Sequence, residues 1–101
     1  PPPKGMRIGE LEINPKSRRV ISAGREVSLT PKEFDILYFL AQNRGEVFTK
    51  EQIYEAVFGF DGTADSSAIT EHIKNIRAKL RPAGESPIET VWGVGYKWKN
   101  G

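Results

Sequence analysis

The sequence predicts a small domain of the α+β class, in which an antiparallel sheet comes first, three helices follow and a hairpin ends the chain. Short β-prone runs separated by turn residues occupy residues 7–29, helical patterns recur three times between residues 30 and 81, and a glycine-bearing turn separates two β-prone runs near the end. A chain of 101 residues, 38% hydrophobic and 28% charged, has the size and composition of one compact domain.

The start of the chain differs from the rest in composition. Pro1 to Pro3 form a stiff, extended stretch, so we interpret residues 1–5 as a linker or terminal remnant and residues 6–101 as the domain. The sequence contains no apolar run of about 18 residues, no secretion signal and no cysteine. We therefore expect a cytoplasmic protein without membrane contact, without disulfides and without a metal or other cofactor.

The first predicted element is a small antiparallel sheet. Gly9, Asn14-Pro15 and Ala23-Gly24 are turn signals that divide this region. The β-prone runs between them are Arg7-Ile8, Leu11 to Ile13, Arg19 to Ile21 and Val27 to Leu29.

Two helices with similar start signals are expected next. Thr30-Pro31-Lys32-Glu33 combines an N-cap threonine, a proline at the first helical position and a glutamate three residues after the cap, and Asn43-Arg44-Gly45 supplies the end. Thr49 to Gln52 repeats the capping pattern and begins a shorter helix that ends before Gly59. Between the two helices, Val47-Phe48 is expected to pair briefly with a sheet.

A third helix is predicted over about residues 66–81, after a polar loop from Phe60 to Asp65. Asp65 and Ser66 are candidates for capping its start, and Pro82-Ala83-Gly84 ends it. Its aliphatic residues recur at i, i+4, i+7 and i+11, a spacing that places them on one face directed at the core. They are Ile69, Ile73, Ile76 and Leu80.

The charge distribution and the C-terminal hairpin point to a function. Ile88 to Val91 and Tyr96 to Trp98 flank the turn of the hairpin. Net charge is only +2, but residues 66–82 contain four Lys or Arg and one Glu. Three helices followed by a hairpin, with positive charge on the third helix, form the arrangement of a winged helix-turn-helix. A helix fits the major groove of B-DNA, and a hairpin beside it reaches the minor groove.

The face of the third helix opposite its aliphatic residues supplies the candidates for DNA contact. Asn75 can pair with an adenine edge, Glu71 can accept a hydrogen bond from a cytosine amino group, and Lys74 can bind guanine or a phosphate. Arg77 and Arg81 lie on the flank, where phosphates run. The full groove-facing set is Ser67, Glu71, Lys74, Asn75 and Ala78.

Four segments, in this order, resemble the OmpR/PhoB family of response-regulator output domains: Leu29 to Phe34, Gly45 to Val47, His72 to Leu80 and Thr90 to Tyr96. The resemblance covers about Met6 to Trp98. It implies a four-stranded N-terminal sheet, three helices and a wing. It also implies a transcription regulator of a two-component phosphorelay, with a receiver domain on its N-terminal side, that is monomeric alone and binds tandem DNA half-sites.

The same resemblance assigns roles to individual residues. It implies base or phosphate contacts from Glu71, His72, Lys74, Asn75 and Arg77, backbone contacts near Thr90 and Tyr96, and a minor-groove position for Trp92, where many members have an arginine. Ser67, also an arginine in many members, Arg81 and Lys97 complete the predicted phosphate contacts. The segment that corresponds to a loop contacting RNA polymerase is Phe58, Gly59, Phe60, Asp61, Gly62, Thr63 and Ala64.

Other classes of function are weighed against this one. We expect no enzyme, because His72 is the only histidine and the sequence shows no base with an orienting partner. Gly93-Val94-Gly95 is too short for a nucleotide fingerprint. A winged helix used as a protein-interaction module remains an alternative, as does DNA binding by charge alone without base reading.

Overall fold

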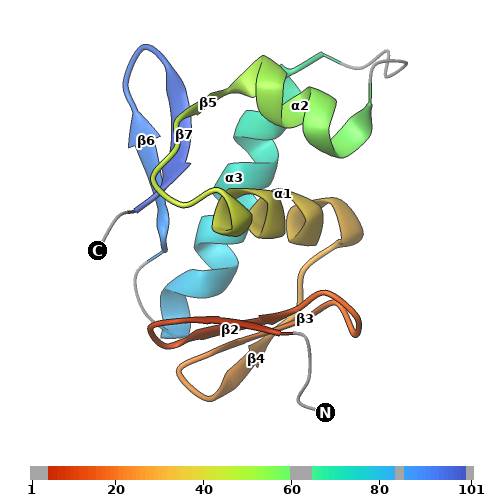
Figure 1. The fold of residues 1–101 in the computed structure, drawn as a ribbon, viewed down its shortest axis with the longest axis vertical. Helices are drawn as coiled ribbons and strands as arrows, with labels where there is room; N and C mark the ends of the chain where they lie inside the picture. Colours follow the sequence, from red (N-terminus) through yellow and green to blue (C-terminus); the bar gives the residue numbers. More distant parts are fainter. Residues whose placement is uncertain (1–4, 60–64, 84–85, 100–101) are drawn as a thin grey trace.

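The computed structural model describes residues 5–59, 65–83 and 86–99 and confirms the predicted fold class. A four-stranded sheet comes first, followed by three α-helices, and a second, three-stranded sheet contains the C-terminal hairpin (Figure 1). In chain order the elements are β1 (Met6–Ile8), β2 (Leu11–Asn14), β3 (Arg19–Ser22), β4 (Arg25–Val27), α1 (Pro31–Gln42), β5 (Phe48–Thr49), α2 (Lys50–Phe58), α3 (Ser67–Leu80), the 3₁₀ turn η1 (Arg81–Ala83), β6 (Ile88–Val91) and β7 (Gly95–Trp98).

The N-terminal sheet is antiparallel with the strand order β1-β2-β3-β4. The prediction for the fourth strand was wrong by two residues, because this strand is Arg25–Val27 and not Val27 to Leu29. Ala23 and Gly24 both have positive φ, at 51° and 80°, and Ser22 lies directly opposite Arg25. A two-residue turn of this kind places the strand immediately after it. Leu29 follows the strand and packs against the core.

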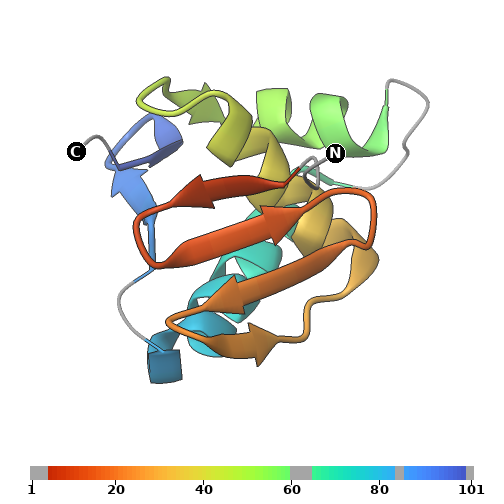
Figure 2. The same cartoon turned by 60° about the horizontal axis from the view of Figure 1, so that its bottom comes forward.

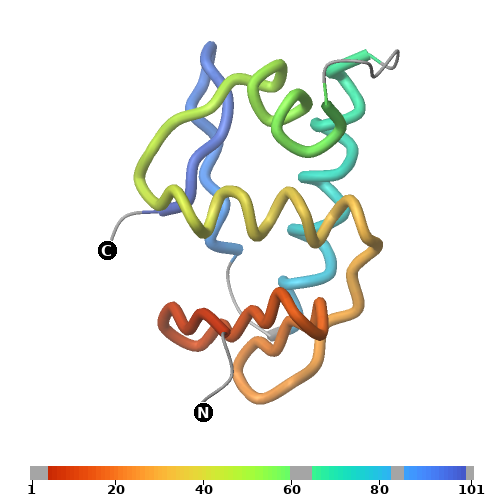
Figure 3. Tube along the Cα trace, turned by 45° about the vertical axis from the view of Figure 1, so that its right-hand side comes forward, coloured from red at the N-terminus to blue at the C-terminus, as the bar shows by residue number. Residues whose placement is uncertain are grey.

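The elements are stacked along the long axis of the molecule. Figures 1 and 3 show the four-stranded sheet at one end, α1 across the middle and α2 at the other end, while α3 runs from the α2 end to the sheet. Viewed from the sheet end, the four strands cover α1 and α3 (Figure 2). The predicted aliphatic face of α3 is confirmed, since its four members expose 1% or less of their surface: Ile69, Ile73, Ile76 and Leu80.

Both predicted capping boxes are present. Thr30 Oγ1 accepts from the backbone N–H of Glu33, and the Glu33 carboxylate accepts from the N–H of Thr30. Thr49 and Gln52 repeat the arrangement at the start of α2. These reciprocal bonds satisfy backbone donors that a helix start otherwise leaves unpaired.

Helix α3 begins differently from the expected pattern. Asp65 Oδ1 accepts from the N–H of Ser67 at 3.0 Å, so Asp65 caps the helix. Ser66 makes no side-chain cap, which corrects the prediction for this residue. Its hydroxyl donates instead to Glu51 Oε2 at 3.2 Å and so connects the start of α3 to the first turn of α2.

The hairpin is anchored in a second sheet with the order β5-β7-β6. Phe48 lies opposite Tyr96 and Thr49 opposite Gly95, which confirms that the Phe48 region pairs with a sheet. The backbones approach so closely that a Cβ on Gly95 would collide with the Phe48 carbonyl group and lie 2.9 Å from the Cα of Thr49. The hairpin turn is closed by the N–H of Val94, which donates to the Val91 carbonyl, and Gly93 supplies the positive φ.

The two ends of the molecule therefore carry different structures. The tip of the β6–β7 hairpin, helix α2 and the N-terminal end of α3 gather at one end, and the four-stranded sheet forms the other (Figure 1). No helix among the described residues has the length and apolar content needed to span a bilayer.

Candidate nucleic-acid interface

The outer face of α3 is polar and open to solvent, as its spacing predicts. Ser67, Glu71, Lys74 and Ala78 are exposed, and Asn75 is half-buried. This face lies opposite the four aliphatic residues that hold the helix against the core. The structure thus brings the predicted base-reading residues Glu71, Lys74 and Asn75 to one surface.

Three cations of α3 and the following turn η1 lack an acidic partner among the described residues: Lys74, Arg77 and Arg81. Arg81 lies in η1, directly after α3, and Figure 1 shows that α3 ends beside the four-stranded sheet, at the opposite end of the molecule from the hairpin tip. Positive charge along a helix that no acidic side chain neutralises is complementary to the negative charge of a phosphate backbone.

Arg77 faces the hairpin. Its Nη2 donates to Thr90 Oγ1 at 2.7 Å and to the Ile88 carbonyl oxygen at 3.1 Å. The guanidinium carbon lies 5.6 Å from the centroid of the Tyr96 ring. In this structure three predicted phosphate ligands, Arg77, Thr90 and Tyr96, therefore contact one another.

The tip of the hairpin is apolar and extends into solvent. Trp92 is 89% exposed and Val94 is 53% exposed. Trp92 therefore does not pack against the sheet. On the adjacent strands, Lys97 lies 3.8 Å from Glu89 and is largely covered.

An open cleft joins the hairpin to the helices. It has a volume of about 360 Å³, and Thr70 of α3, Lys50 at the start of α2 and hairpin residues line it. The hairpin residues are Thr90, Val91, Trp92, Gly93, Val94, Gly95 and Tyr96. Thr70 of α3, Lys50 at the start of α2 and the exposed Trp92 therefore surround the same cleft.

Lys50 and Thr70 line this cleft but were not among the residues that the sequence predicted to contact DNA. Thr70, Lys74 and Arg77 follow one another at i, i+4 and i+7, a spacing that places Thr70 beside two predicted contacts. Lys50 carried no comparable local signal, because its position depends on the pairing of β5 with the distant strand β7.

Phe58 belongs to α2, which confirms the predicted helix end before Gly59 and corrects the loop start at residue 58 that the resemblance implied. It is the last residue of α2, is half-buried and stacks between Tyr54 at 4.6 Å and His72 at 6.0 Å between ring centroids. The Lys32 ammonium lies 4.7 Å from the Phe58 ring and donates to the Val57 carbonyl oxygen at 3.2 Å. Gly59 follows as the C-cap, and Phe60 to Ala64 lie outside the described residues.

His72, a predicted phosphate ligand, is half-buried against this ring. Its Nδ1 is buried without a hydrogen-bond partner among the described residues. The imidazole therefore serves in part to pack α3 against the end of α2.

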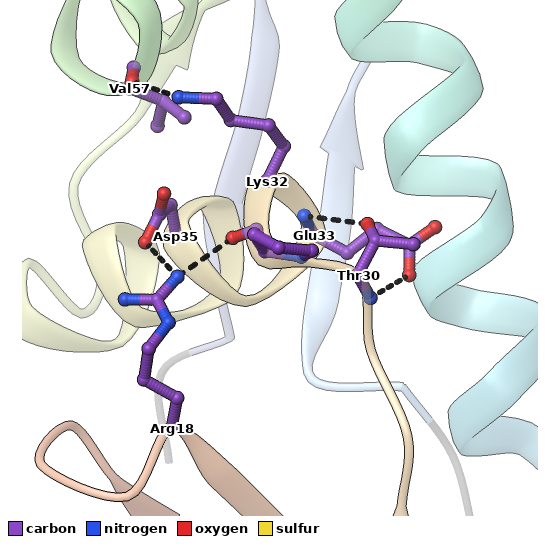
Figure 4. Close-up of polar contacts among 7 residues, drawn as sticks. Arg18, Thr30, Lys32, Glu33, Asp35 and Val57 are labelled. Atoms are coloured by element: carbon purple, nitrogen blue, oxygen red, sulfur yellow. Dashed lines mark hydrogen bonds and ion pairs between the residues drawn. The ribbon is translucent and has the colours of Figure 1, made fainter.

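Helix α1 holds α3 and the sheet in place by side-chain contacts near its first turn. Arg18, in the β2–β3 turn, donates to Asp35 at 2.6 Å and to the Pro31 carbonyl at 2.9 Å (Figure 4). On α3, the Lys79 ammonium lies 2.6 Å from Glu33, which is buried. Burial raises the pKa of the Glu33 carboxyl, but the hydrogen bonds from Lys79 and Thr30 outweigh it and hold that pKa below its usual range.

Comparison with known proteins identifies the family. Residues 24–98 match the family model described as "Transcriptional regulatory protein, C terminal". The chain is 47% identical over 83 residues to transcriptional regulatory protein SpaR of Bacillus subtilis, covering 82% of this chain and 38% of SpaR. It is 45% identical over 94 residues to regulatory protein VanRB of Enterococcus faecalis, covering 93% of this chain and 41% of VanRB. The chain thus spans about two fifths of these relatives.

Solved structures show the same architecture. The response regulator DrrB of Thermotoga maritima, described as an OmpR/PhoB homologue, superimposes with a TM-score of 0.82 at 33% identity, covering 95% of this chain and 44% of DrrB. The DNA-binding domain of Klebsiella pneumoniae RstA, solved in complex with the RstA box, gives a TM-score of 0.81 at 27% identity, covering 94% of this chain and 96% of that domain. From its sequence match and its fold, the chain belongs to the OmpR/PhoB family of transcriptional regulators, as a C-terminal DNA-binding domain of the winged-helix type.

Proposed function

We propose that this domain binds double-stranded DNA with sequence preference and regulates transcription as the output domain of a two-component response regulator. The observation that carries the proposal is the continuous surface formed by the polar face of α3 and the cleft beside it, which the hairpin and the start of α2 complete. A helix with an exposed Lys74 and a half-buried Asn75 on its polar face, beside a projecting hairpin, fits the two grooves of one duplex.

In the proposed complex, α3 lies in the major groove and reads bases with its exposed polar side chains. Asn75 pairs with an adenine edge, Lys74 binds guanine, and Glu71 accepts from a cytosine amino group. Glu71 gives discrimination rather than affinity, because its carboxylate repels the surrounding phosphates.

Phosphate contacts flank this helix. Ser67 and Arg81 lie toward the two ends of α3, and Lys50 approaches from α2 across the cleft. The remaining proposed backbone contacts come from His72, Thr90, Tyr96 and Lys97, and Trp92 enters the minor groove at the hairpin tip. Such contacts fix the register of the protein on the duplex, whereas the base contacts give the specificity.

The partners expected from the resemblance belong to the proposal as well. A receiver domain precedes this domain in the full-length cytoplasmic protein, and two copies bind tandem half-sites although the isolated domain is a monomer. The segment from Phe58 to Ala64 contacts RNA polymerase, with Phe58 acting from the end of α2.

Selection of bound duplexes from a random DNA pool tests the proposal, followed by titration of the enriched and a scrambled duplex at several salt concentrations. We expect an enriched direct repeat that the domain binds at least about a thousandfold more tightly than the scrambled duplex. Equal affinities with a steep salt dependence would indicate binding by charge alone. No binding at physiological salt would favour a protein-interaction module.

A further inference from the structure

We propose that Arg77 is a positioning residue, which holds the hairpin against the recognition helix so that Trp92 reaches DNA. This inference rests on the proposed function, and it replaces the phosphate contact expected for Arg77 with a structural connection between the two DNA-binding elements.

The geometry of the guanidinium supports this role. One nitrogen, Nη2, donates both to the hydroxyl of Thr90 and to the backbone carbonyl of Ile88, two residues apart on β6. The central carbon of the same guanidinium lies 5.6 Å from the centroid of the Tyr96 ring of β7. Because Thr90 and Tyr96 are directly opposed in the hairpin, a single side chain contacts both of its strands.

The position of β6 explains why such a contact matters. In the strand order β5-β7-β6, β6 is an edge strand whose backbone pairs on one side with β7 alone. Its other edge carries unpaired backbone groups, and the Ile88 carbonyl is one that Arg77 satisfies. Arg77 therefore joins α3 to β6, the hairpin strand that pairs with only one neighbouring strand.

The two side-chain hydrogen bonds that the structure shows for Arg77 both go to β6 and not to the groove-facing side chains of α3. Both of its acceptors are uncharged, so its positive charge stays near the proposed interface while its directional bonds go to the hairpin. Arginine suits this arrangement because its planar fork can satisfy several acceptors at once, which a lysine ammonium does not reproduce.

The test uses Arg77→Ala and Thr90→Val, each alone and combined with Trp92→Ala, on the duplex that the wild-type domain selects. Thr90→Val removes the acceptor without changing any charge, and Thr90→Ser, which keeps the hydroxyl, is the matched control. Thermal unfolding followed by circular dichroism establishes that each variant is folded. If Arg77→Ala does not fold, the Thr90→Val variant alone is used for the test.

If Arg77 positions the hairpin, Trp92→Ala weakens binding by about tenfold in the wild-type and Thr90→Ser backgrounds. The same change weakens binding by less than about twofold in the Arg77→Ala and Thr90→Val backgrounds, because the indole is already displaced. The salt slope of Thr90→Val stays within experimental error of the wild-type value, because this change removes no charge.

Two results would overturn the inference and are distinguishable from each other. In the first, Trp92→Ala keeps its full effect in both the Arg77→Ala and Thr90→Val backgrounds, and the salt slope falls by roughly one in Arg77→Ala alone. This result would make Arg77 a phosphate ligand and would leave the proposed function standing. Failure of the wild-type domain to bind any duplex refutes the proposed function and the inference together.

Discussion

The Lys79 ammonium lies 2.6 Å from a carboxylate oxygen of Glu33, and this contact joins the last turn of α3 to the first turn of α1. The same oxygen accepts the backbone N–H of Thr30. Glu33 is the one charged side chain among the described residues that is buried, at 2% exposure. Its carboxylate thus begins one helix and anchors the recognition helix.

Replacing Lys79 with Met should destabilise the fold, because it leaves the Glu33 carboxylate buried with only its capping bond. We expect a loss of about 2 kcal/mol in the free energy of unfolding, below the range for fully buried pairs because Lys79 is itself 38% exposed. Glu33→Gln should cost less, about 1 kcal/mol, since glutamine can still cap the helix. Urea unfolding measures both changes, and a larger loss for Glu33→Gln would contradict the assignment.

The same ion pair predicts a dependence of stability on pH. The pKa of Glu33 is lowered in the folded protein, so its contribution is complete above the ordinary glutamate pKa of about 4.3 and is lost as the pH falls through the folded value. The difference in unfolding free energy between wild type and Glu33→Gln should be constant from about pH 6 to 8 and shrink below about pH 4. Glu10→Gln is the control, because Glu10 is exposed in the β1–β2 turn and forms no ion pair among the described residues.

Replacing Asn75 with Ala should weaken binding to the selected duplex by about 1–3 kcal/mol and remove the preference at one base pair. The physical reason is the loss of two hydrogen bonds to one base edge. Titrations against duplexes that differ from the selected site by one base pair measure the effect. Equal losses on all of these duplexes would assign Asn75 to a role other than base reading.

Replacing Lys50 with Ala should weaken binding to every duplex alike and lower the salt slope by roughly one, because the ammonium that lines the cleft is proposed to bind a phosphate. Lys16→Ala is the matched control, since Lys16 is exposed in the β2–β3 turn at the other end of the molecule. Salt titrations with the selected duplex compare the two variants. Identical slopes for Lys50→Ala and wild type would exclude this phosphate contact.

Gly95→Ala should displace the hairpin, because the added methyl group meets the backbone of Phe48 and Thr49 and neither can move without breaking the pairing of β5 with β7. We expect a destabilisation of about 1–3 kcal/mol. Gly93→Ala places a side chain at positive φ, which is strained, but the added Cβ meets no neighbouring atom. Gly93→Ala should therefore be the milder change in thermal unfolding, and the reverse order would contradict the close approach.

Local signals in the sequence predicted most of the helices. The capping boxes at Thr30 and Thr49 and the aliphatic spacing of α3 depend only on residues within a few positions of one another. The fourth strand was misplaced because the apolar residues Val27 and Leu29 suggested a strand over residues 27–29. The two-residue turn at Ala23-Gly24 requires the strand to begin at Arg25. The turn residues were the stronger signal.

The interface was predictable in its polar face but not in its internal contacts. The exposure of Lys74 and Glu71 follows from helical periodicity. The bonds of Arg77 to the hairpin and the place of Lys50 in the cleft depend on how distant segments pack, which no local pattern encodes. Phe58 is a different case, since the local helical pattern correctly ended α2 before Gly59 whereas the resemblance assigned Phe58 to a loop.

The pairing of β5 with β7 sets an order for folding. Phe48 and Tyr96 are separated in sequence by nearly half of the 101-residue chain, and both α2 and α3 lie between them. Closing so long a loop is entropically unfavourable until the intervening helices have condensed on α1. The hairpin should then consolidate last during refolding, with amide protons of β7 protected later than those of α1 in pulse-labelled hydrogen exchange. A nascent chain emerging from the ribosome would acquire its helical core well before it becomes competent to recognise an operator.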